Sequence, residues 1–96
     1  MSLKCVHATV SGRVQGVGFR YFVGAVAGRL GVTGWVRNVA NGDVEVWAQA
    51  EPEVLEDFIG RLRSGPPTAY VQNVAIEWKD PDPNLSGFDF RPTSYR

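Results

Sequence analysis

The first part of this chain contains no acidic residue. All ten carboxylates lie from Asp43 onward, although the net charge of the chain is zero. The charged side chains of residues 1–42 are all basic, namely Lys4, Arg13, Arg20, Arg29 and Arg37. This asymmetry favours an anionic ligand near the first half of the chain, but surface charge balanced across the folded domain would explain it equally well.

Cysteine and histidine each occur once, as Cys5 and His7. A single cysteine excludes an internal disulfide and a multi-cysteine zinc site, and it suits a reducing compartment. No apolar run approaches the length of a membrane span or of a signal sequence, so we expect a cytoplasmic protein without a membrane partner. The length of 96 residues, 44% of them hydrophobic, indicates one globular domain over residues 1–96.

Hydrophobic spacing predicts strands and helices in the order β-α-β-β-α-β. Alternation predicts a strand over Lys4 to Ser11, and apolar positions three and four apart predict a helix from Phe19 that Gly31 ends. Asn41-Gly42 between two β-rich runs predicts a hairpin. The rest of the chain reads as a helix from Pro52 closed by Gly65, a strand over Tyr70 to Lys79, and a short strand around Phe88 and Phe90.

This order is the split βαβ arrangement, an α+β fold. We expect an antiparallel sheet with both helices on one face. Right-handed crossovers are expected to bring the first strand and the strand over Tyr70 to Lys79 together at the centre of the sheet.

The stretch "GRVQGVGFR", from Gly12 to Arg20, carries three glycines into the predicted start of the first helix. Glycines let consecutive N–H groups point inward as a nest, and a helix N-terminus adds free donors, so the loop suits an oxyanion. Arg20 can add a two-pronged fork for phosphate or carboxylate oxygens. Taken alone, the three glycines would be explained equally well by a tight turn that binds no ligand. Two nucleotide-binding loops are excluded. Tyr21 occupies the position of the third glycine of a dinucleotide-binding loop, and the Gly-Lys-Ser/Thr sequence of a nucleotide phosphate loop is missing.

The loop followed by "GVTGWVRN", "NGDVEV" and "GPP", in this order and spacing, closely resembles the acylphosphatase family, small hydrolases of carboxyl-phosphate mixed anhydrides. The resemblance covers Val6 to about Arg91. It implies a ferredoxin-like fold, a small-molecule acyl phosphate as substrate, and inorganic phosphate as product and inhibitor. The ending "FDFRPTSYR" departs from the Phe-x-Ile-Arg-Tyr type of the family.

The resemblance also implies the roles of the site residues. Arg20 would bind the phosphoryl group through its guanidinium, and Asn38 would position the attacking water. The backbone amides that would cradle the phosphoryl group are those of Val14, Gln15, Gly16, Val17, Gly18, Phe19 and Arg20. Judged without the family, Asn38 reads as an ordinary turn residue before Asn41-Gly42.

A carboxylate is a good leaving group, so positioning and charge stabilisation can carry the reaction without a strong general acid. We therefore expect a monomeric enzyme that uses no cofactor and no metal and binds no nucleic acid. The alternatives are a catalytically inactive module of the same fold that binds or senses a phosphate-bearing ligand, and more remotely a ferredoxin-like nucleic-acid module.

Three other groups of residues offer weaker hypotheses. His7 could act with Cys5 or a serine, but a partly buried strand histidine is the better interpretation. Asp80 and Asp82, with Glu77, could form a metal or acid/base cluster, but "DPDP" is more typical of a solvated loop. A stacking face for single-stranded nucleic acid would use aromatics that otherwise read as packing residues: Trp35, Trp47, Tyr70, Trp78 and Phe90.

Overall fold

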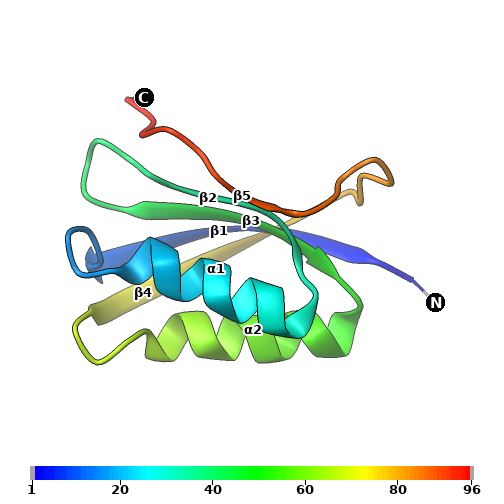
Figure 1. The fold of residues 1–96 in the computed structure, drawn as a ribbon, viewed down its shortest axis with the longest axis horizontal. Helices are drawn as coiled ribbons and strands as arrows, with labels where there is room; N and C mark the ends of the chain where they lie inside the picture. The colour runs from blue at the N-terminus through cyan, green and yellow to red at the C-terminus, as the bar shows by residue number, and fades with distance from the viewer. Residues whose placement is uncertain (1, 96) are drawn as a thin grey trace.

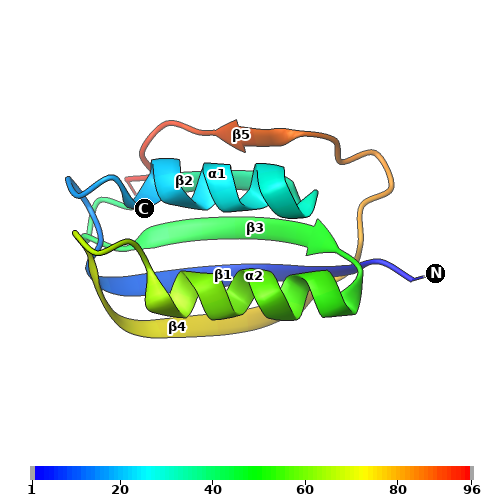
Figure 2. The ribbon, with the colours of Figure 1, turned by 60° about the horizontal axis from the view of Figure 1, so that its bottom comes forward.

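The computed structural model describes residues 2–95 and contains a five-stranded sheet with two helices on one face (Figures 1 and 2). The elements along the chain are β1 (Lys4–Arg13), α1 (Phe19–Leu30), β2 (Thr33–Asn38), β3 (Val44–Ala50), α2 (Pro52–Ser64), β4 (Tyr70–Lys79) and β5 (Phe88–Phe90). The predicted α+β fold and its β-α-β-β-α-β order, with the short closing strand, are confirmed.

The strand order across the sheet is β4-β1-β3-β2-β5. β1 pairs with β4 as expected, but β4 lies at the edge, so the prediction that both occupy the centre is wrong for β4. The reason is that β3 pairs with the other side of β1 and carries its hairpin partner β2 with it. β5 then runs parallel to β2, which makes this edge of an otherwise antiparallel sheet mixed.

The helix ends follow from local sequence. α1 begins after Gly18, which has φ 79°, and ends at Gly31, whose φ of 74° lets its N–H bond back to Ala27. α2 has Pro52 in its first turn, where a missing N–H costs nothing, and Gly65 caps its last turn. Within residues 2–95, neither helix is long and apolar enough to cross a membrane.

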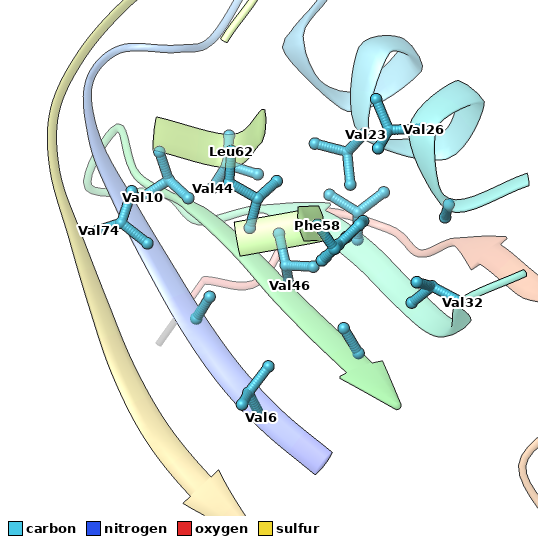
Figure 3. Packing of buried hydrophobic residues seen from close by; sticks show 14 of the residues in the cluster. Val6, Val10, Val23, Val26, Val32, Val44, Val46, Phe58, Leu62 and Val74 are labelled. Carbon is cyan, nitrogen blue, oxygen red and sulfur yellow. The ribbon is translucent and has the colours of Figure 1, made fainter. Parts of the chain in front are cut away.

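The hydrophobic core lies between the helices and the inner face of the sheet (Figure 3). β1 and β3 contribute alternate valines because successive strand residues point to opposite faces. The helices contribute residues three and four apart. Among the buried side chains labelled in Figure 3 are Val10, Val44 and Val46 from the strands and Val23, Val26, Phe58 and Leu62 from the helices.

The opposite face of the sheet carries a packed aromatic and ionic layer. The rings of Trp35 and Trp47 stack with centroids 6.0 Å apart. The guanidinium carbons of Arg37 and Arg91 lie 4.8 and 4.6 Å from the Trp35 ring centroid, and Trp35 is only 8% exposed. The aromatics considered for nucleic-acid stacking therefore do not form one open platform, because arginines cover Trp35 and Phe90 packs near α1 instead.

Glu45 is the centre of the ionic part of this layer. Its carboxylate accepts hydrogen bonds from Nε of Arg37 at 2.5 Å and Nε2 of His7 at 2.6 Å, and Glu77 lies 3.7 Å from the other ring nitrogen of His7. Burial alone would raise the pKa of Glu45, but these hydrogen bonds and charges outweigh it and lower the pKa below its ordinary value of 4.5.

A lowered pKa means that the ionised form of Glu45 stabilises the fold. This contribution is fully present above pH 4.5 and is lost as the pH falls through the lower pKa of the folded state. We expect Glu45→Gln to reduce the free energy of unfolding at pH 7 by about 1–2 kcal/mol, since two charge-assisted hydrogen bonds are lost. Chemical denaturation at pH 7 and at acid pH measures this. An equal deficit at both pH values would contradict the assignment.

Candidate active site

A hollow of about 230 Å³ lies where the loop between β1 and α1 meets the end of β2. This loop, the β2–β3 hairpin and the connection from α2 to β4 lie at one end of the molecule (Figure 1). The hollow is lined by Val14, Gly16, Gly18, Phe19, Arg20, Tyr21 and Asn38. The structure thus brings Arg20 and Asn38, 18 positions apart in the sequence, to one site.

Two of the three glycines in the loop have the left-handed backbone that a nest requires. Gly16 has φ 72° and Gly18 has φ 79°, and a Cβ atom added at either would meet no atom within 4 Å. Conformation rather than crowding therefore accounts for glycine at both positions. The open space beside them is where a ligand can approach the backbone.

Gly12 has a different role and belongs to the sheet. It lies at a register shift between β1 and β4, has φ 125°, and a Cβ atom there would lie 2.2 Å from the carbonyl oxygen of Tyr70. The bulge lets Val71 pack against the core. Only part of the glycine pattern in "GRVQGVGFR" thus concerns a ligand.

The backbone amides of residues 15–20 are unpaired within the described structure. No carbonyl or side chain of residues 2–95 accepts a hydrogen bond from them, and Gly18 offers no side-chain cap. The positive end of the α1 dipole lies at the same place, and the first turn of α1 contains no acidic residue. Unpaired donors at a helix N-terminus suit the oxygens of a phosphate or carboxylate.

Arg20 adds a cation to this end of α1. The ion pairs found among residues 2–95 all involve other basic side chains, so no carboxylate neutralises its guanidinium. Its side chain is half-buried and lines the hollow. Arg20 is therefore available for an anion from outside the protein, which agrees with the uneven charge of the sequence.

Asn38 is the last residue of β2 and presents an unusual amide. Its Oδ1 is fully buried and has no hydrogen-bond partner within the described part of the chain. Leaving a buried acceptor unpaired costs about 1–3 kcal/mol, so such atoms are uncommon unless a ligand or water completes them. Asn38 as a whole is only partly buried and lines the hollow, so a small turn of its side-chain amide would present this unpaired oxygen to a molecule bound there.

Long-range hydrogen bonds fix the two halves of the site relative to each other. The Gln15 side chain donates to the carbonyl oxygens of Val39 and Asp43, at 2.7 and 2.8 Å, and so ties the loop to the β2–β3 hairpin. The hydroxyl of Thr68 donates to the carbonyl of Val17 at 2.6 Å. Gln15 and Thr68 thus brace the loop, and the side chains of Gln15 and Val17 do not line the hollow.

The C-terminal segment supports Asn38 from outside the sheet. The amide of Ser94 donates to the Asn38 carbonyl at 2.9 Å, and the amide of Ala40 donates to the Ser94 carbonyl at 2.7 Å. The departure of "FDFRPTSYR" from the family ending therefore does not prevent the tail from pairing along β2. Sequence reasoning gave no sign of the Thr68 and Ser94 contacts, since neither residue belongs to a motif.

The described residues give no support to the weaker hypotheses of a Cys5–His7 pair or an acidic metal cluster. Cys5 is buried, and burial raises the pKa of its thiol despite a hydrogen bond with Trp47. His7 bonds to Glu45 rather than to Cys5. Among residues 2–95, no three His, Cys, Asp or Glu side chains gather as a metal site, and the Asp82 backbone is instead bonded to the Gln49 side chain.

Comparisons with known proteins agree on one family. The acylphosphatase family model matches residues 6–90. The acylphosphatase of Trichormus variabilis is 45% identical over 86 residues, which cover 90% of this chain and 84% of that protein. The crystal structure of acylphosphatase from Bacillus subtilis superposes with a TM-score of 0.88 at 32% identity, covering 94% of this chain and 99% of the other. An acylphosphatase from Coxiella burnetii gives 0.87 at 43% identity, with 93% of each chain covered.

Proposed function

The chain belongs to the acylphosphatase family, enzymes that hydrolyse acyl phosphates, and from this premise we propose how its own residues perform the reaction. The phosphoryl group lies in the loop before α1, Arg20 binds it, and Asn38 holds the attacking water. The observation that carries this proposal is that Asn38, whose Oδ1 has no hydrogen-bond partner in the described part of the chain, lines the same hollow as the free loop amides.

The loop recognises the phosphoryl oxygens through many weak donors and one strong one. The amides of Val14 to Arg20 donate to the oxygens, and the guanidinium of Arg20 adds parallel N–H bonds with a full positive charge. Because the loop is braced by Gln15 and Thr68, these donors are in place before the substrate arrives. Preorganised donors stabilise the charge of the transition state without reorganisation during the reaction.

Asn38 acts on the water molecule. Its Oδ1 accepts a hydrogen bond from the water and directs the lone pair of the water oxygen toward phosphorus, in line with the departing carboxylate. The new bond joins the water oxygen to phosphorus as the bond between phosphorus and the carboxyl oxygen breaks. The electron pair stays on the carboxylate, and both protons of the water end on inorganic phosphate.

The residues that line the hollow include no carboxylate and no imidazole. This composition suits an acyl phosphate, because the carboxylate leaves without being protonated by a strong acid. It suits a simple phosphate ester less well, since an alkoxide leaving group would need a proton donor.

We expect the purified protein to hydrolyse benzoyl phosphate at the same rate with and without excess chelator, within about twofold. The proposed site binds the phosphoryl group with backbone amides and a guanidinium, which are donors to anions rather than metal ligands. Rates measured after extensive dialysis against the chelator test this. Activity that is lost on chelation and restored by a divalent cation would contradict the mechanism. A folded protein with no activity at all would favour the non-catalytic phosphate-binding alternative.

We further propose that the enzyme works as a single-domain monomer in the cytoplasm and that inorganic phosphate inhibits it competitively. Inhibition follows from the mechanism, because the product keeps the oxygens that the loop recognises. A monomer suffices for the proposed reaction, because Arg20, Asn38 and the loop amides all belong to the same chain. The cytoplasm is supported by a single buried cysteine that forms no disulfide.

A further inference from the structure

Two exposed aromatic rings lie side by side next to the candidate active site. Tyr21 is 70% exposed and Phe90 is 49% exposed, and their ring centroids are 5.5 Å apart. Tyr21 also lines the hollow that holds Arg20 and Asn38. The Arg20 guanidinium carbon lies 6.0 Å from the Tyr21 ring centroid. An apolar surface therefore continues outward from the place where the phosphoryl group is expected.

The fold holds these rings in place from two separate elements. Phe90 belongs to β5, where it pairs with Val36 of β2, two residues before Asn38. Its ring lies against α1 at Gly24, where an added Cβ atom would come within 2.5 Å of the ring. Tyr21 is one helical turn before Gly24, on the same side of α1. The absence of a side chain at Gly24 thus lets Phe90 approach α1 and reach Tyr21.

Core packing does not require this arrangement, since both rings are largely exposed. Adjacent exposed aromatics cost solvation free energy and often mark a surface that contacts a ligand. In an acyl phosphate, the acyl group is joined to the phosphoryl group through one oxygen. An acyl group must therefore leave the hollow beside its lining residues, and Tyr21 is the large aromatic ring of that lining with an exposed face.

We propose that Tyr21 and Phe90 form an acyl subsite that selects acyl phosphates with an aromatic or other large apolar acyl group. This proposal rests on the proposed function, because it assumes that the phosphoryl group lies in the loop before α1. Ring contacts act on the acyl group alone and leave recognition of the phosphoryl oxygens to Arg20 and the loop amides. The subsite thus affects the choice of substrate rather than the chemical step.

The experiment compares kcat/KM for benzoyl phosphate and acetyl phosphate. We expect the wild-type protein to prefer benzoyl phosphate. Tyr21→Ala should lower kcat/KM for benzoyl phosphate about five- to tenfold, mainly by raising KM, and that for acetyl phosphate by no more than about twofold. Tyr21→Phe keeps the ring and should retain the preference. Trp78→Ala removes a similarly exposed aromatic at the other end of the sheet and serves as the matched control.

Phe90→Ala should reduce the same preference. The inhibition constant of inorganic phosphate should change by less than about threefold in all of these variants, since an exposed contact between the Tyr21 ring and the Arg20 guanidinium contributes little. Equal losses for both substrates, or an unchanged preference in Tyr21→Ala, would overturn the acyl subsite. If Phe90→Ala does not fold, the kcat/KM values of Tyr21→Ala, which changes an exposed side chain, test the proposal without it. A wild-type protein that hydrolyses neither substrate would instead overturn the proposed function, and the subsite with it.

Discussion

Asn38→Ala is expected to lower kcat by about two to three orders of magnitude, the effect of removing one preorganised polar group from an active site. The Asn38 amide holds water in line with the departing carboxylate, so it acts mainly in the transition state. It contributes little to the phosphate that the loop binds in the ground state. The inhibition constant of inorganic phosphate should therefore change by less than about threefold.

This variant separates a role in chemistry from a role in folding. The Oδ1 of Asn38 has no partner within residues 2–95, so its removal leaves no other group unpaired and should not lower the thermal unfolding temperature. Asn73→Ala, at an exposed position on β4, is the matched control and should keep wild-type kinetics. Wild-type kcat in a folded Asn38→Ala protein would refute the assignment. So would a loss of phosphate affinity in proportion to the loss of activity.

Arg20→Lys is expected to lower kcat/KM by about two to three orders of magnitude. Lysine keeps the positive charge but loses the planar pair of donors that matches two phosphoryl oxygens. Unlike Asn38, Arg20 contacts the phosphoryl group in the ground state as well. Inhibition by inorganic phosphate should thus weaken about ten- to hundredfold, as expected for the loss of a charge-assisted hydrogen bond.

Steady-state kinetics with inorganic phosphate as the inhibitor measure both effects. Arg29→Lys makes the same change at an exposed position in the last turn of α1 and is expected to behave like the wild type. If Arg20→Lys binds phosphate nearly normally, Arg20 has a structural role and the account of the cradle is wrong.

Most of the secondary structure could be predicted because its signals are local. The apolar spacing of α1 and the glycine after it define that helix within a few residues. The hairpin at Asn41-Gly42 likewise depends on two adjacent residues, and the Asn41 side chain accepts a hydrogen bond from the Asp43 amide within the turn. Elements of this kind need no information from distant parts of the chain.

Features that depend on distant pairing could not be predicted in this way. The edge position of β4 follows from β3 pairing with β1, which no single segment encodes. Gly12 looked like part of the phosphate loop, but its constraint comes from Tyr70, 58 positions later. Packing was the preferred interpretation of Trp35, but the sequence did not indicate that Arg91 from the last part of the chain would cover its ring.

The candidate site was predicted in part, and mainly through family resemblance. Local physics suggested an anion site from Gly16, Gly18 and Arg20, but it favoured a turn role for Asn38. The structure supplies evidence for a site role of Asn38. Its unpaired Oδ1 and its position beside the loop depend on the tertiary placement of β2 and could not be predicted from the local sequence. The hydrogen bonds from Gln15 and Thr68 that brace the loop are also tertiary contacts, and the sequence analysis predicted neither of them.

The proposed mechanism depends above all on binding of the phosphoryl group by the loop amides. Titration of the ¹⁵N-labelled protein with inorganic phosphate, followed through its backbone amide resonances, tests this most directly. The largest shifts should occur at residues 14–20, with one common Kd that matches the inhibition constant for hydrolysis of an acyl phosphate. Shifts centred elsewhere, such as on the exposed Lys4 and Lys79 near Trp78, with residues 14–20 unaffected, would contradict this mechanism.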